Sequence, residues 1–451
     1  MGSSVRELAG KTPAGRDRYV DLLRVASLGT VVVGHWLMAA VTVGDDGAEV
    51  GNLLAVVPEL QLVTWALQIM PVFFFVGGFS HALSYRSLSR RSGGRSVYSA
   101  FLRARLQRLL RPTMVFIGVW GAGALLLQWG GRGGGLLDVA LRLVAQPLWF
   151  IGVYLAMVAF TPPLLWLHER WGWGAFGALV AAAGAVDVAR FAFGVPYLEF
   201  LNFAFVWLAV HQLGFLRADG MLRMPYVLAG AGLAGASLLV ALGPYPLSMV
   251  GMPGERVSNM APPTFALLCH GMWLVGAVEL LRAPATRWLA RPRVWRGVVA
   301  ANGVSMTAFL WHLTAMLGVY GTLLALDVPL PEPASAAWWA QVPLRMAAAT
   351  ALTVALVALF RRFERPGAVG PGAVGPVAPG TASGPAAALG VTLCLFGVLG
   401  LSMVGFGGLL EGRTAMLIAV HVTAPAAVGM ALAGWLVVER AGGRVRARRW
   451  R

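Results

Sequence analysis

The sequence predicts an all-α, polytopic membrane protein with about twelve membrane-spanning helices. Of its 451 residues, 58% are hydrophobic and only 12% are charged, and the mean hydropathy is +0.71. This composition is too apolar for a soluble multidomain chain. Apolar windows of about twenty residues, the length that crosses a bilayer, recur along the chain. The expected spans lie near 19–42, 60–85, 112–130, 146–167, 173–192, 198–216, 225–243, 262–281, 298–323, 340–360, 387–410 and 414–438.

A Pro/Gly-rich stretch divides the expected helices into two groups. Residues 366–386 contain the segment GAVGP twice in succession, which is typical of an extended linker. We therefore expect a ten-helix core over 1–365, an appended pair of transmembrane helices over 387–440 and a basic tail over 441–451. No longer repeat is visible, which weighs against an inverted-repeat transporter.

The distribution of positive charge predicts the orientation in the membrane. The formal net charge is +17, which in a soluble protein would suggest a nucleic-acid partner. When the spans are threaded from a cytoplasmic N-terminus, most basic residues fall in cytoplasmic segments, as the positive-inside rule requires. The others fall within the first span or on or near the outer side: Arg24, Arg132, Arg142, Arg190, Arg256, Arg345 and Arg413. We therefore expect a multi-pass protein of the plasma membrane with both termini cytoplasmic, in contact with lipids and with no nucleic acid.

Ionisable side chains interrupt the first apolar run, RDRYVDLLRVASLGTVVVGHWLMAA, which carries Asp21, Arg24 and His35. A helix turns about 100° per residue, so the eleven-residue step from Arg24 to His35 places both on one face, about 16 Å apart. Such groups inside a span are costly and mark functional paths. Asp21 and Arg24 could instead only anchor the helix at the headgroups, whereas His35 is too deep for that. A neutral imidazole suits general-base work on a hydroxyl, so His35 is the candidate base.

Two further histidines are candidates for the same buried polar site. His81 follows PVFFFVGGFS near the inner end of the second expected span, and His312 lies in ANGVSMTAFLWHLTAM in the ninth. A lone histidine in an apolar helix is also compatible with a packed, hydrogen-bonded core group.

A basic segment precedes the third expected span. Its arginines recur every three residues before a proline, and therefore share much of one helix side at the mouth of the membrane: Arg105, Arg108 and Arg111. Guanidinium groups at that place suit a phosphorylated ligand.

Several familiar chemistries have no signature in the chain. There is no GxSxG elbow, HExxH, P-loop or CxxC motif. The two cysteines, Cys269 and Cys394, lie far apart in apolar runs, so no disulfide framework and no metal site are expected.

Taken together, four stretches resemble the membrane-bound acyltransferase family 3, whose members are integral-membrane O-acyltransferases of bacterial glycans and natural products. YVDLLRVASLGTVVVGHW matches the family's Asp, Leu-Arg and Arg-x10-His pattern through Asp21, Arg24 and His35. PVFFFVGGFSHALSYR is similar to its Phe-rich second helix, and RARLQRLLRP to its Arg-x-x-Arg motif. The fourth stretch, PLWFIGVYL, carries the Trp-Phe pair at Trp149 and Phe150. The resemblance covers about residues 16–365.

The resemblance implies acyl transfer across the membrane. An acyl-CoA, usually acetyl-CoA, would donate from the cytoplasm to a hydroxyl of a glycan, a lipid-linked molecule or a secreted small molecule. Arg105 and Arg108 would hold the nucleotide phosphates, and Asp21 would orient Arg24. His81, Trp149 and His312 remain substrate or supporting candidates. Some family members carry acidic residues after the Trp-Phe pair, whereas Tyr154 and its neighbours are not acidic.

Two other functions remain compatible with the sequence. Many helices and a mid-membrane histidine also suit a proton-coupled transporter or flippase. A lipid-phosphosugar-dependent glycosyltransferase would use carboxylates in the first outer loop, where Asp45, Asp46 and Glu49 lie.

Overall fold

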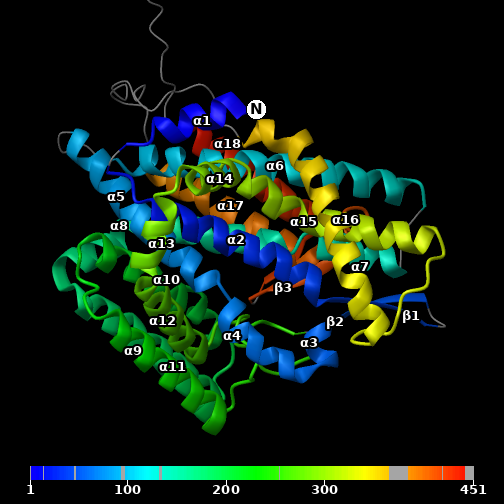
Figure 1. Ribbon diagram of the computed structural model, residues 1–451, viewed down its shortest axis with the longest axis horizontal. Helices are drawn as coiled ribbons and strands as arrows, with labels where there is room; N and C mark the ends of the chain where they lie inside the picture. The colour runs from blue at the N-terminus through cyan, green and yellow to red at the C-terminus, as the bar shows by residue number, and fades with distance from the viewer. Residues whose placement is uncertain are drawn as a thin grey trace, which may run out of the picture. The chain divides into compact units, whose positions relative to one another are not determined.

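The computed structural model describes residues 2–13, 15–44, 47–92, 97–131, 135–252, 254–364, 384–418 and 420–441. In these residues, eleven helices are long and apolar enough to cross a membrane, or up to twelve if one bent pair is a single span (Figure 1). The bent pair is Phe265–Leu280 and Arg282–Leu289, whose axes differ by 50°. The prediction of an all-α polytopic membrane protein is confirmed.

One compact unit comprises Met1–Ser80 and Leu164–Val357. It contains the first part of α5 (Met70–Arg91), the last part of α8 (Pro147–Trp171) and most of α16 (Ala336–Phe360), and the complete elements are given next. These are α1 (Gly2–Gly10), α2 (Arg18–Met38), β1 (Ala39–Gly44), β2 (Gly47–Asn52), α3 (Leu53–Val56), the 3-10 helix Pro58–Val63, α4 (Thr64–Leu67), α9 (Trp173–Phe193), the 3-10 helix Leu198–Leu201, α10 (Asn202–Ala218), α11 (Pro225–Leu242), α12 (Phe265–Leu280), α13 (Arg282–Leu289), α14 (Pro292–Asn302) and α15 (Ser305–Ala325).

A second compact unit comprises His81–Pro163 and Ala358–Arg451. The division between the units passes through three helices: α5 (Met70–Arg91), α8 (Pro147–Trp171) and α16 (Ala336–Phe360). The other elements of the second unit are α6 (Tyr98–Trp129), α7 (Gly135–Leu143), the 3-10 helix Arg361–Phe363, α17 (Gly384–Val404), β3 (Thr414–Leu417), β4 (Val420–Thr423) and α18 (Ala424–Ala441).

Helix α2 has defined signals at both ends. The Asp17 carboxylate caps its start by accepting from the backbone N–H groups of Tyr19 and Val20 at 3.0 and 3.2 Å, and these N–H groups have no partner within a helix. The helix ends at Met38, where Ala39 takes an extended conformation. The following β-branched residues favour a strand, and β1 pairs with β2 as an antiparallel hairpin (Figure 1).

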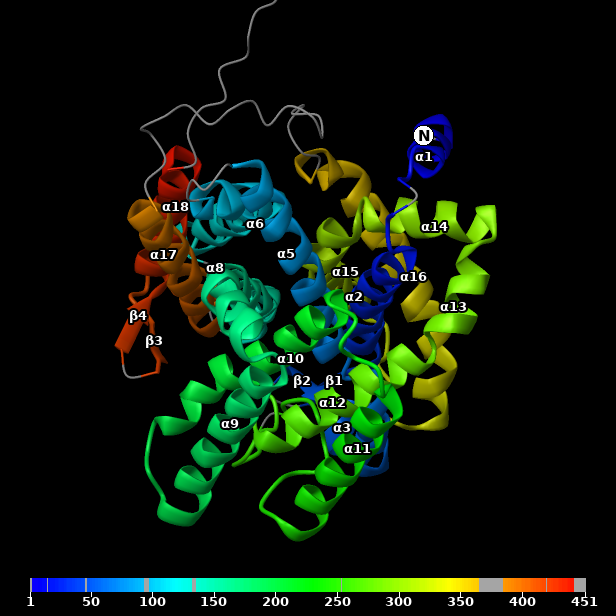
Figure 2. The same ribbon diagram turned by 90° about the vertical axis from the view of Figure 1, so that its left-hand side faces the viewer.

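Two expected span boundaries are therefore corrected. The first span was expected to continue to residue 42, but it ends at Met38 because Val41, Thr42 and Val43 belong to β1. The last span was expected from residue 414, but it begins at Ala424 because the preceding residues form the β3–β4 hairpin, which Figure 2 shows below α18.

Helix α6 begins earlier than expected. The apolar window started at Pro112, whereas the helix runs without interruption from Tyr98 and holds Pro112 inside. A proline removes one helical hydrogen bond but does not necessarily end a helix in an apolar environment. The predicted arginine row is consequently part of the same helix as the third span.

The two C-terminal helices, α17 and α18, pack closely against each other. A Cβ added at Gly397 would lie 2.4 Å from the Ala431 backbone nitrogen, and one at Gly434 would lie 2.5 Å from the Cys394 backbone nitrogen. Small residues let membrane helices approach to this distance. The linker predicted at 366–386 and the tail predicted at 441–451 fall almost wholly outside the described residues.

Candidate active site

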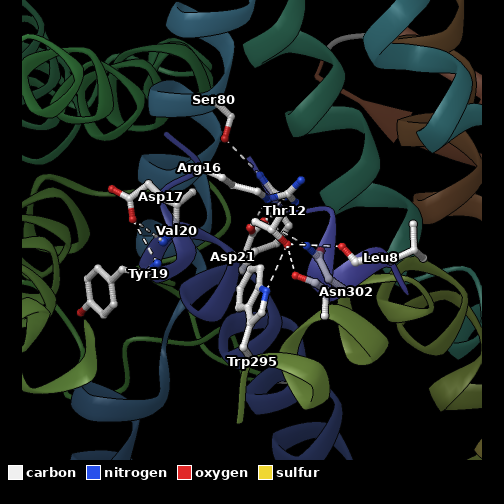
Figure 3. A network of polar contacts seen from close by, with 12 residues as sticks. Leu8, Thr12, Arg16, Asp17, Tyr19, Val20, Asp21, Ser80, Trp295 and Asn302 are labelled. Carbon is white, nitrogen blue, oxygen red and sulfur yellow. Dashed lines mark hydrogen bonds and ion pairs between the residues drawn. The ribbon is translucent and has the colours of Figure 1, made fainter. Parts of the chain in front are cut away.

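Asp21, in the first turn of α2, binds groups from three segments. Arg16 Nε and Nη2 donate to its two carboxylate oxygens at 2.6 and 3.0 Å, and Arg24 Nη1 lies 3.6 Å from Oδ1. Asn302, at the end of α14, donates to Oδ1 at 3.0 Å (Figure 3). Asp21 is only 4% exposed, so cations and an amide compensate its charge in place of water. The hydrogen bond to Asp21 raises the pKa of the Arg16 guanidinium above its ordinary value.

Arg24 is also held from α5. Its Nη2 donates to Ser80 Oγ at 3.1 Å. Ser80 reaches this position because α5 crosses α10 very closely two residues earlier. A Cβ added at Gly78 would lie 1.9 Å from the His211 carbonyl oxygen and 3.3 Å from Gly214 Cα. Only glycine fits there, so the Gly-Gly-Phe segment of α5 serves to place a hydroxyl beside Arg24.

A second ion-pair group holds the start of α2. Arg217 of α10 donates to Asp17 at 2.8 Å and to Glu279 of α12 at 2.7 Å. Its guanidinium carbon lies 4.5 Å from the centroid of the Phe79 ring, and its side chain is 3% exposed. Because buried charges are costly to separate, these pairs fix α2 against α10 and α12 and give Asp21 and Arg24 a defined position.

At the other end of α2, His35 meets His312 of α15. His35 Nδ1 and His312 Nε2 are 3.3 Å apart, and the ring centroids are 5.0 Å apart. The Trp36 indole N–H donates to the His312 carbonyl oxygen at 2.9 Å, which is a further link between the two helices. The structure therefore joins two of the predicted site residues, although they come from the first and ninth expected spans.

The hydrogen bonds assign the tautomers of both rings. His35 Nδ1 lies 2.8 Å from the Val31 carbonyl oxygen, and His312 Nδ1 contacts the Phe309 carbonyl oxygen. Because carbonyl oxygens only accept, each Nδ1 carries the hydrogen. His35 Nδ1–H also points to His312 Nε2, and His35 Nε2 has no hydrogen-bond partner among the described residues. The basic lone pair of a neutral His35 is therefore on a nitrogen that can receive a proton.

The predicted arginine row lies on α6, in the second unit, and one of its members lies beside a carboxylate of α18. Arg111 Nε lies 4.0 Å from Glu439 Oε1 on α18, and Arg103 Nε lies 3.7 Å from Glu439 Oε2. Gln107 donates to the same carboxylate at 3.0 Å. The three-residue spacing suggested that Arg111 acts with Arg105. Arg111 instead lies with Arg103 and Gln107, which are spaced four residues apart, around the Glu439 carboxylate. Glu439 lies far along the chain, so this grouping was not visible in the sequence.

The remaining arginines of the row differ in exposure. Arg108 is exposed, whereas Arg105 is half-buried. An exposed guanidinium can reach a ligand without breaking an internal ion pair.

His81, also in the second unit, has a different environment from His35. It is fully buried, its Nε2 lies 2.9 Å from the Tyr154 hydroxyl, and its Nδ1 lies 3.5 Å from Thr161 Oγ1. Both ring nitrogens thus contact α8. Trp149, on the same helix, packs against Phe150 with ring centroids 6.4 Å apart.

Groups that could hold a metal are not found in the part of the chain that the structure describes. No cluster of three or more His, Cys, Asp or Glu side chains occurs among those residues. Of the carboxylates considered for a glycosyltransferase, Asp45 and Asp46 lie outside the described residues, and Glu49 lies exposed on β2.

The fold and the site define the class of the molecule. It is a polytopic membrane protein whose first long helix carries an ion-paired arginine at one end and a histidine with an available basic nitrogen at the other. Residues 17–362 match the model of a family described as an acyltransferase domain. Because this match covers well over half of the chain, the protein belongs to acyltransferase family 3 and is a membrane acyltransferase. No curated protein and no solved structure matches the chain.

The family match distinguishes between the functions that were compatible with the sequence. It favours an acyltransferase over the transporter and the glycosyltransferase, and it ends before α17.

The predictions did not include Arg16, Ser80 or Asn302, which complete the Asp21 and Arg24 contacts. Ser80 lies in a stretch that carries the resemblance and Asn302 in the stretch that contains His312, but nothing in those stretches showed that they converge on α2.

Proposed function

We propose that the protein transfers an acyl group, most simply acetyl, from acyl-CoA to a hydroxyl of a glycan, a lipid-linked molecule or a secreted small molecule, with His35 as general base. One observation carries this proposal: His35 is oriented through Nδ1 by Val31 and His312, and its Nε2 is left available. Geometry of this kind is what a general base on a hydroxyl requires.

The reaction at His35 balances as a simple acyl transfer. His35 Nε2 accepts the hydroxyl proton as the oxygen attacks the thioester carbonyl carbon, a C–O bond forms, and the C–S bond breaks. The imidazolium then returns the proton to the departing CoA sulfur. While His35 is positively charged, His312 Nε2 and the Val31 carbonyl oxygen accept its Nδ1–H and stabilise the cation. His312 acts here as a positioning residue.

The start of α2 has a separate role in the proposal. Arg16 and Arg24 together carry two positive charges against the single negative charge of Asp21, so this cluster keeps a net positive charge. Asp21 and Ser80 fix the direction of the Arg24 guanidinium. We assign Arg24 to polar groups of the donor arm, which would extend along α2 from there towards His35.

The nucleotide phosphates are assigned to Arg105 and Arg108 of α6. The exposure of Arg108 supports this assignment, because its guanidinium can approach phosphate oxygens from solvent. Arg111 is a weaker candidate, since it already lies beside the Glu439 carboxylate, which it shares with Arg103. In this proposal the termini and the basic end of α6 lie on the cytoplasmic side of the plasma membrane, where acyl-CoA is available.

The first experiment uses membranes that contain the full chain, acetyl-CoA labelled in its acetyl group, and a matched His35→Ala sample. We expect label in base-labile ester or in free acetate with the wild type, and a loss of roughly 10²–10⁴-fold in the variant, the range of a general base. Equal rates in the two samples, both above empty membranes, would exclude His35 as the base.

A binding measurement tests the donor site separately. The affinity for CoA should fall in Arg105→Ala and in Arg108→Ala, while Arg90→Ala, an exposed arginine on α5, serves as the matched control. Affinities equal to wild type in both α6 variants would refute the donor assignment and leave the role of His35 to the transfer assay.

A further inference from the structure

A hollow in the first unit lies between residues of α2, α15 and α16. Its cavity volume is about 20 Å³. Its aromatic and charged lining residues are Trp36, Tyr320, Trp338 and Arg345. A space of this size admits one small polar group of a ligand, about the size of a water molecule, and not a whole glycan.

Arg345 brings an uncompensated positive charge to this hollow. It lies within α16, one of the membrane-spanning candidates, and its partners are neutral: Nη1 donates to the Tyr320 hydroxyl at 2.8 Å and Nη2 to the Trp338 carbonyl oxygen at 2.9 Å. The guanidinium carbon lies 4.6 Å from the Trp338 ring centroid. No acidic side chain of the described residues forms an ion pair with Arg345. A half-buried cation without a counter-ion, near the outer end of an expected span, is therefore a candidate site for an anion.

Two N–H donors on residues that line the hollow also lack acceptors in the described part of the chain. Arg345 Nε and Trp338 Nε1 are both buried without a hydrogen-bond partner in the described chain, and Trp338 is 1% exposed. Buried N–H donors nearly always have an acceptor. Two unsatisfied donors on residues of the same hollow therefore indicate that an acceptor is missing. A water molecule would satisfy an N–H group but would leave the charge uncompensated, whereas an anion supplies both.

The hollow is adjacent to the proposed base. Trp36, which lines it, follows His35 in α2 and donates to the His312 carbonyl oxygen at 2.9 Å. The Arg24 cluster lies at the opposite end of α2. The hollow thus lies at the His35 end of α2, opposite the end to which the donor arm is assigned.

We propose that this hollow binds the acidic group, a carboxylate or a phosphate, of the hydroxyl-bearing acceptor, and thus that the acceptor is anionic. Arg345 and Trp338 would be the binding residues, and the aromatic wall would pack against the acceptor body. This inference rests on the proposed acyl transfer, because it assigns the second substrate of the same site.

The test measures binding of two soluble probes, phenyl glucuronide and phenyl glucoside, to the full chain in phosphatidylcholine nanodiscs. The probes share the ring and the aromatic group and differ in the carboxylate. We expect the glucuronide to bind at least about tenfold more tightly, the range of a charge-assisted hydrogen-bonded pair. Arg345→Gln should abolish that preference and leave glucoside binding unchanged, and Arg345→Lys should restore part of it.

Controls keep the result interpretable. Arg142→Gln changes an exposed arginine of α7 and should keep the preference, and thermal unfolding of each variant checks folding. Equal binding of the two probes by the wild type, or a preference that survives in Arg345→Gln, overturns the proposal. If phosphatidylglycerol in the nanodisc removes the preference, the occupant is a lipid headgroup and the acceptor assignment is wrong. Label transfer from acetyl-CoA is scored independently, so either proposal can fail without the other.

Discussion

His35 and His81 are both histidines in apolar helices, yet their surroundings differ in which ring nitrogen remains available. His35 uses only Nδ1, which contacts the Val31 carbonyl oxygen and His312. His81 uses both nitrogens, one with the Tyr154 hydroxyl and one with Thr161, and is fully buried. The first environment orients a base, whereas the second satisfies a core side chain.

The comparison shows that burial and membrane depth do not by themselves separate a catalytic histidine from a structural one. Both residues lie in segments that carry the family resemblance, and the sequence pattern does not distinguish between them. The deciding property is the hydrogen-bond pattern around the imidazole, because general-base chemistry requires one nitrogen that is oriented and one that is open.

The largest expected effect comes from substituting the two histidines in parallel. His35→Gln should lower kcat roughly 10²–10⁴-fold, because it removes the base, while His81→Gln should retain kcat within about tenfold and lower the unfolding temperature, because a buried hydrogen-bonded pair is lost. Transfer of labelled acetyl and thermal unfolding measure the two outcomes. If His81→Gln proved as inactive as His35→Gln while still folded, the distinction drawn here would fail.

An intermediate effect is expected at His312. His312→Leu removes one of the two acceptors of the His35 Nδ1–H and leaves the Val31 carbonyl oxygen. We therefore expect kcat to fall about ten- to a hundredfold, in the range of one charge-stabilising hydrogen bond, while the KM for acyl-CoA stays unchanged. His312→Gln offers an amide oxygen at a similar place and should restore part of kcat. A rise in KM with kcat intact, or equal loss in both variants, would contradict a positioning role through His35.

The smallest effect is expected at Tyr154. Tyr154→Phe removes the hydroxyl that contacts His81 Nε2 and keeps the ring. The free energy of unfolding should drop by about 1–3 kcal/mol, the cost of leaving a buried polar group unsatisfied. The rate of label transfer should stay within about twofold to threefold of wild type, because the Tyr154 hydroxyl has no part in the proposed chemistry. A much larger loss of activity would indicate that the His81–Tyr154 pair contacts substrate.

Local chemistry predicted much of the fold. Span positions followed from apolar length, and the start of the first span near residue 19 followed from the charge that precedes the apolar run. Errors appeared where a longer-range partner decided the boundary: α2 ends early because β1 pairs with β2, and α18 starts late because β3 pairs with β4. Pattern alone does not show which extended residues will find a partner.

The candidate site was predictable in its principal residues and not in their contacts. Arg24 and His35 could be placed on one helix face from a spacing of eleven residues, because helical geometry is local. The contacts of His35 with His312, of Asp21 with Asn302 and of Arg111 with Glu439 depend on helices that are far apart in the sequence.

The sequence by itself determined the all-α membrane class, the family and the segments that carry ionisable groups, because hydropathy, helical spacing and motifs are properties of short segments. Only the tertiary structure decided that His35 has an available Nε2, that His81 is satisfied on both nitrogens, and that Arg345 lies in a hollow without a counter-ion. The physical reason is that hydrogen-bond satisfaction and charge compensation depend on which helices pack together, and the sequence of one helix does not contain that information.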